Sequence, residues 1–154
     1  MHGQETVSIF VALYAYKRGD YQQCLRLSTQ NVHTLLNAVY MPDILTFPEF
    51  IQLLDDDIVS LTALTLLAHP KCRRNSGYVT VSQLTLSLYL MTQCQLKLRH
   101  SVVSLAQTLD YIKVAHWRHP VEETLNRLVL KMIAHKALTY ITTQMNQVIT
   151  DNMP

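Results

Sequence analysis

The chain has few residues that interrupt helices and few that carry charge. Three of its 154 residues are glycine and five are proline, while 16% are charged and 49% are hydrophobic. Disordered chains are poor in apolar residues and rich in charge, so this composition excludes that class. Scarce glycine and proline leave few positions for turns, which favours long helices. We expect a single all-helical domain over residues 1–154, and whether it is a fragment of a larger protein stays open.

Cysteine and long apolar runs are also scarce. Cys24, Cys72 and Cys94 form an odd set in unrelated contexts, which favours a reducing compartment over a secreted disulfide framework. No segment reaches the roughly 20 uninterrupted apolar residues that a membrane helix needs. A net charge of +2 is too small to require a polyanionic partner. The sequence therefore predicts a cytoplasmic protein with no membrane partner.

Apolar spacing and capping residues predict a series of helices joined by short turns. His69–Tyr78 is the most polar and turn-rich part of the chain, and we expect a surface loop there. After His119, proline in the first helical position opens a last helix of about 30 residues or more, roughly 45 Å long. The predicted helices cover residues 5–18, 20–41, 46–54, a stretch starting at 58, 80–98, 101–117 and 120 onward.

The stretch 79–98 has two periodicities. Leu84, Leu86, Leu88 and Leu90 alternate with polar residues or tyrosine, which is the period of a strand. The pattern continues without a turn signal for about 20 residues, which exceeds ordinary strand length. We therefore favour a helix capped at Thr80, and a partial strand stays open.

A tight helical hairpin is indicated at YAYKRGDYQQCL, residues 14–25. Gly19 can adopt the left-handed conformation that closes a helix at little steric cost. Asp20 can then cap the next helix, with Gln23 three residues on. Hairpins of this kind build scaffolds more often than active sites.

This motif resembles the turn of a tetratricopeptide repeat, a family of antiparallel helix pairs stacked into a superhelix that binds other proteins. The resemblance covers about residues 5–38, one repeat length. Matching positions are Lys17, Gly19, Asp20, Tyr21 and Leu25, with Cys24 at a small-residue position and Val32 at an apolar one. Departures are Ser8 for the usual tryptophan, Ala12 for glycine and Leu36 for proline. No clean second copy follows about 34 residues later, so we expect an irregular, tetratricopeptide-like array of antiparallel helices with a long C-terminal helix.

The resemblance implies a ligand-facing wall on the first helix. Its residues would be Thr6, Ile9, Leu13, Tyr16 and Lys17. Members of the family that bind the C-terminal tails of chaperones use lysine and asparagine to hold the tail's carboxylate. Ile9 and Leu13 occupy those positions here, so the resemblance implies an apolar groove. The alternative is that these side chains are ordinary core, covered by the C-terminal helix.

A basic patch is the second candidate site. It comprises Lys71, Arg73 and Arg74 in the predicted loop and Arg127 and Lys131 on the last helix. These cations could bind phosphates, although charges on one side of a long helix usually form its solvated face.

The sequence contains no convincing catalytic or metal-binding pattern. His116 and His119 straddle a predicted helix break, and His69 with Cys72 likewise has no nearby third ligand. The run of aspartates at 55–57 is explained by its place before a helix. We therefore predict no enzyme, no metal and no cofactor.

The pattern as a whole favours a noncatalytic protein–protein interaction module or scaffold. Its partner would be another protein or peptide, or a second copy bound through the C-terminal helix. Two alternatives stay open: a nucleic-acid-binding helical domain that uses Arg73, Arg74, Arg127 and Lys131, and a helical accessory region of a larger enzyme.

Overall fold

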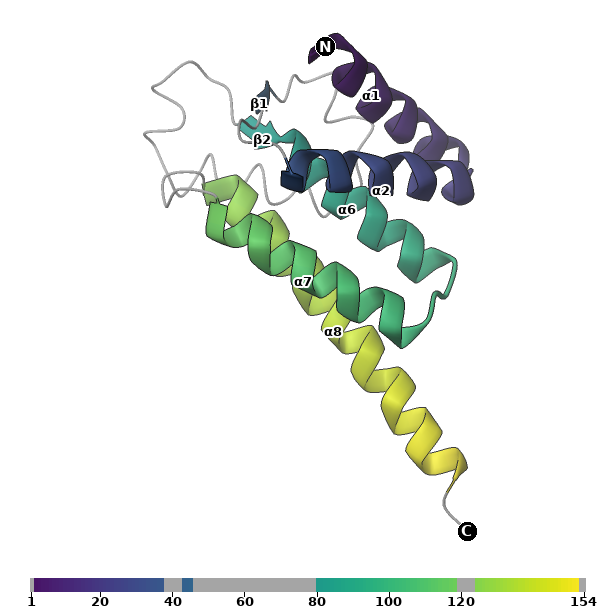
Figure 1. The fold of residues 1–154 in the computed structure, drawn as a ribbon. Helices are drawn as coiled ribbons and strands as arrows, with labels where there is room; N and C mark the ends of the chain where they lie inside the picture. Colours follow the sequence, from purple (N-terminus) through teal and green to yellow (C-terminus); the bar gives the residue numbers. More distant parts are fainter. Residues whose placement is uncertain (1, 38–42, 46–79, 119–123, 153–154) are drawn as a thin grey trace.

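Five helices and a small two-stranded sheet make up the described part of the chain in a computed structural model (Figure 1). The structure describes residues 2–37, 43–45, 80–118 and 124–152. The predicted all-α class is confirmed, and the tetratricopeptide-like repeat stays a prediction. The elements are α1 (His2–Arg18), α2 (Tyr21–Asn37), β1 (Asp43–Leu45), β2 (Thr80–Ser82), α6 (Gln83–Lys97), α7 (Val102–Arg118) and α8 (Thr124–Asp151).

The turn between α1 and α2 has the geometry that the sequence predicts. Gly19 has φ of 83°, and its N–H donates to the Tyr16 carbonyl at 3.0 Å. The Asp20 N–H donates to the Ala15 carbonyl at 2.9 Å, which completes the paired hydrogen bonds of a Schellman motif. Asp20 Oδ1 then accepts from the Gln23 N–H at 3.3 Å and caps α2.

The core is centred on α6, which contacts all four other helices. Every residue from Gln83 to Gln95 is buried, on all sides of the helix. This explains the continuous apolar pattern with an ambiguous period, because a helix covered all round needs no polar face. α1 and α2 pack on it as one hairpin, and α7 and α8 cover other parts of its surface.

The start of α6 differs from the prediction. Thr80–Ser82 form strand β2, which pairs antiparallel with β1 and places Val81 opposite Ile44. Ser82 is the N-cap, since its Oγ accepts from the Thr85 N–H at 3.1 Å. The predicted cap at Thr80 is therefore wrong, and within the stretch of uncertain period the described residues, from Thr80 on, are part strand and part helix.

A second hairpin, between α6 and α7, repeats the first turn without glycine. Arg99 has φ of 54° and donates its N–H to the Leu96 carbonyl at 3.3 Å, while the His100 N–H donates to the Gln95 carbonyl at 3.0 Å. These two hydrogen bonds have the pattern found at Gly19. The Ser101 Oγ then accepts from the Ser104 N–H at 3.2 Å and caps α7.

Side chains connect the two hairpins. The Arg118 guanidinium, at the end of α7, donates to the carbonyls of Leu35 at 3.2 Å and Leu36 at 2.6 Å. It thereby satisfies carbonyls in the last turn of α2, which have no partner within that helix. The rings of His33 and Tyr111 also meet edge to face, with centroids 5.6 Å apart.

Several predicted elements lie outside the described residues. They are the helices at 46–54 and from 58, the loop at His69–Tyr78, and the predicted first turn of the last helix at Pro120. The described part of that helix, α8, has 28 residues.

Candidate interaction surface

The first-helix wall does not form an open groove. Ile9 and Leu13 are 0% exposed and Tyr16 is 6% exposed, because α1 packs its apolar face against α2 and α6. The alternative, ordinary core, therefore holds for these three residues, with α2 and α6 as the covering elements. Lys17 is exposed, and the side chain of Thr6 lies outside the described part.

The basic patch is described in part. Lys71, Arg73 and Arg74 lie outside the described residues, whereas Arg127 is half-buried and Lys131 is exposed one turn later on α8. Lys136, further along that helix, lies against α6, with its Nζ 3.4 Å from Gln93 Oε1. The described residues thus include only two members of the predicted patch, Arg127 and Lys131, and the patch stays a prediction.

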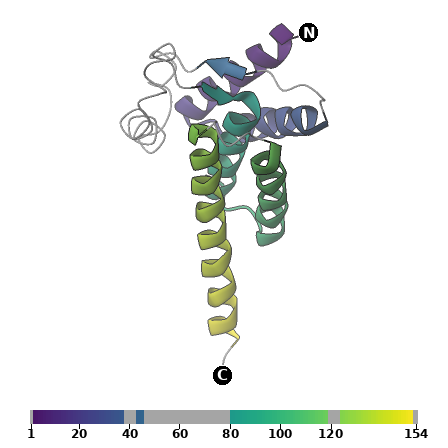
Figure 2. The ribbon, with the colours of Figure 1, turned by 90° about the vertical axis from the view of Figure 1, so that its left-hand side faces the viewer.

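The C-terminal part of α8 projects beyond the other helices in both ribbon views (Figures 1 and 2). Its first half lies in the core through Leu125, Val129 and Ile133. Tyr140 is half-buried and donates its hydroxyl to the His100 carbonyl at 3.1 Å. Beyond Tyr140, every described residue is exposed except Ile141 and Gln144, which are half-buried.

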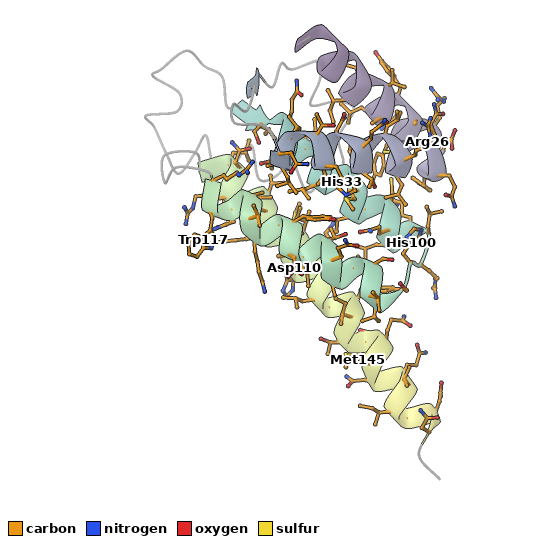
Figure 3. All side chains as sticks on the ribbon, viewed as in Figure 1. Arg26, His33, His100, Asp110, Trp117 and Met145 are labelled. Carbon is orange, nitrogen blue, oxygen red and sulfur yellow. The ribbon has the colours of Figure 1, made fainter. Side chains whose placement is uncertain are left out.

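The projecting end carries an uncovered apolar stripe, and Figure 3 labels one of its members, Met145. Its members recur after three, four and three residues, which places them on one side of a helix. The stripe consists of Leu138 (52% exposed), Ile141 (half-buried), Met145 (54%) and Val148 (58%), with Ile149 (57%) beside them. At about 100° per residue, its centre lies roughly 100° around α8 from the core-facing residues, so it forms a second apolar face.

A second exposed apolar group lies at the end of α7. Trp117 is 90% exposed and points away from the helices (Figure 3), and Val114 is 46% exposed. Together with Lys113 and Arg118 they line a shallow groove of about 340 Å³. The described chain breaks off directly after this group, at residue 118, so the α8 stripe is the better defined surface.

The described residues do not assemble a metal centre or a membrane span. Across 2–37, 43–45, 80–118 and 124–152, no three His, Cys, Asp or Glu side chains meet where they could hold a metal ion. His116 is half-buried on α7, and its predicted companion His119 lies outside this part of the chain. In the same residues, no helix combines the length and hydropathy needed to cross a bilayer.

Sequence reasoning predicted the long helix but missed the stripe. The signal was present: Leu138, Ile141, Met145 and Val148 follow the three-and-four spacing of a helix-pairing seam. It is hidden because α8 has two apolar faces, one in the core and one outside, and the helix as a whole therefore shows no simple amphipathic pattern.

Comparison with protein-family models, with curated proteins and with solved structures finds no match for this chain. Functional inference therefore rests on the chain's own surfaces.

Proposed function

We propose that this chain is a noncatalytic protein-interaction module of tetratricopeptide-like helical architecture, and that it binds a second copy of itself through the α8 stripe. The observation that supports this most directly is the stripe itself: three of its four side chains, and the neighbouring Ile149, are more than half exposed on a helix end that its own bundle leaves uncovered. Contiguous exposed apolar surface of this kind marks interaction sites in soluble proteins.

The charge distribution favours an apolar protein surface as partner. Between Ala137 and Asn152, Asp151 is the sole charged residue. A surface that binds nucleic acid or an anionic lipid headgroup requires clustered lysine and arginine. The projecting end has neither, and Arg127 and Lys131 lie at the opposite end of α8.

The spacing of the stripe favours a second copy over an unrelated partner. Apolar residues spaced alternately three and four positions apart form a seam along a helix. Two helices pair along such seams by packing their side chains as knobs into holes. In an antiparallel pair centred near Thr143, Leu138 faces Val148 of the other copy and Ile141 faces its Met145. Each of these pairs then brings an apolar side chain of one copy against an apolar side chain of the other. This arrangement also places the two bundles at opposite ends, where they do not compete for space.

The expected affinity is modest. Burying the exposed half of a large apolar side chain contributes about 1.2 kcal/mol. Eight such side chains, four from each copy, give roughly 10 kcal/mol, from which association costs of at least about 4 kcal/mol must be subtracted. The dissociation constant should therefore be on the order of 0.1 mM.

The test is sedimentation equilibrium over about 10 µM to about 1 mM protein, a range that brackets this constant. We expect reversible dimerisation of the wild-type chain. Met145→Lys should leave a monomer at all concentrations, because it would place two charges in the apolar seam. Asn146→Lys, one residue on and about 100° around the helix, is the matched control and should dimerise as wild type does.

Two results would overturn the proposal. One is a wild-type chain that stays monomeric at the highest concentration, and the other is a dimer that Met145→Lys leaves intact. Circular dichroism of each variant shows whether the fold is retained. If the chain instead binds a polyanion column, and neutralising Arg127 and Lys131 abolishes that binding, the nucleic-acid alternative gains support.

A further inference from the structure

Two buried cysteines face each other between α2 and α6. Cys24 and Cys94 are 70 positions apart in the sequence, and both are 0% exposed. Their side chains hydrogen-bond to each other, so the two sulfur atoms are neighbours across the most extensive helix–helix contact in the described part of the chain. Taken from the sequence alone, they are unrelated buried residues.

Cys24 lies in a cluster of polar side chains with Cys94 and Ser28. Its hydrogen bond with Cys94 lowers the pKa of the Cys24 thiol, and Ser28 lowers it further, against the opposing effects of burial and of the Asp20 charge. Ser28 Oγ lies 3.7 Å from Cys24 Sγ and donates to the Cys24 carbonyl at 2.6 Å. A thiol with a lowered pKa has a larger thiolate fraction, and the thiolate is the form that reacts with oxidants.

We infer that Cys24 and Cys94 are a redox modification site that closes to an intramolecular disulfide when a peroxide reaches it. The Cys24 thiolate attacks one peroxide oxygen, the O–O bond breaks, and water leaves after protonation; Cys24 is then a sulfenic acid. The Cys94 sulfur next attacks the Cys24 sulfur, the S–O bond breaks, and a second water carries away the Cys94 proton. Peroxide is reduced to two waters as two thiols become one disulfide.

The disulfide would join the two hairpins covalently. α2 belongs to the first hairpin and α6 to the second, so the link would close a loop that includes every residue between them. Closing so long a loop restricts the unfolded chain strongly. Because both thiols are buried, oxidation requires local opening of the interface and should be slower than for an exposed thiol.

The site is independent of the proposed dimer. The cysteines lie on α2 and α6, whereas the stripe lies on the projecting end of α8. Oxidation should therefore leave the sedimentation behaviour unchanged.

The test treats the full chain with hydrogen peroxide and maps its peptides without reduction. We expect a mass loss of about 2 Da and a Cys24–Cys94 linked peptide. The melting temperature should rise by roughly 10 °C and return to its starting value after dithiothreitol. Cys72→Ser is the matched control, and it should retain both the link and the rise.

Cys24→Ala and Cys94→Ala should each abolish the link, and alanine is the substitution of choice because serine would bury a new polar group. If either variant fails to fold, peptide mapping of the wild-type chain still decides. Oxidation that stops at sulfinic or sulfonic acid, a link that involves Cys72, or two thiols that stay reduced in the folded chain would each overturn the inference.

Discussion

The two hairpin turns allow the free-energy cost of a left-handed residue to be measured twice, once by adding a side chain and once by removing one. Both place one residue in the left-handed conformation, and both satisfy the end of the preceding helix with the same pair of hydrogen bonds. At the first turn this residue is Gly19, with φ of 83°, and at the second it is Arg99, with φ of 54°. The left-handed conformation costs a residue with a side chain about 1–2 kcal/mol, whereas glycine adopts it freely.

Gly19→Ala should therefore destabilise the fold, and Arg99→Gly should stabilise it. A Cβ at residue 19 would meet no atom within 4 Å, so the loss comes from the backbone alone and should be about 1 kcal/mol. At residue 99, relief of about 1–2 kcal/mol is partly offset by the greater freedom of glycine in the unfolded chain. The net gain should be about 0.5–1 kcal/mol. Because Arg99 is exposed, removing its side chain should change the stability little beyond this backbone effect.

Thermal or urea unfolding measures both effects. The expected shifts in melting temperature are about 3 °C downward for Gly19→Ala and about 2 °C upward for Arg99→Gly. Arg99→Ala is the matched control: it removes the guanidinium but retains the strained backbone, so its stability should stay near wild type. If Arg99→Gly proves destabilising, or if Arg99→Ala gives the same gain, the shared-turn reasoning is refuted.

Three further substitutions test how the helices are held together. Arg118→Ala should cost about 1–2 kcal/mol in unfolding free energy, because two carbonyls at the end of α2 lose their donor, and Lys113→Ala on the same helix should have little effect. Asn126→Ala should cost about 1–3 kcal/mol, since the buried Ser82 N–H would lose the Asn126 Oδ1 acceptor at 2.9 Å, while Asn126→Asp keeps an acceptor oxygen. Ser87→Ala should be neutral or stabilising by up to about 1 kcal/mol, because Ser87 Oγ is buried without a hydrogen-bond partner among the described residues. Urea unfolding is the measurement for all three.

Local chemistry explains which parts of the fold were predictable. The turn at Gly19 and the helix from Ser101 to about Trp117 depend on residues within a few positions of each other, and the structure confirms both, with α7 ending one residue later than predicted. The second turn was harder to recognise, because Arg99 occupies the position where glycine is expected.

Contacts between distant segments explain the rest. Thr80–Ser82 form a strand because they pair with Asp43–Leu45. That partner lies far back in the sequence, so the local pattern does not predict the pairing. The first-helix wall is core because α1 packs against α2 and against α6, a helix that is buried on every side. The pairing of Cys24 with Cys94 likewise depends on how α2 and α6 pack, which no local pattern reveals.

The lengths of the helices connect the fold to the proposed function. At 1.5 Å per residue, α8 is about 42 Å long, whereas its neighbours α6 and α7 are about 22 Å and 26 Å. Neither neighbour can cover the last roughly 15 Å of α8, however its side chains are arranged. A helix end with only polar residues could remain in water, but this one carries Met145, Val148 and Ile149 more than half exposed. A second chain can supply the apolar surface that the described bundle is too short to provide, and an identical stripe already has the matching spacing.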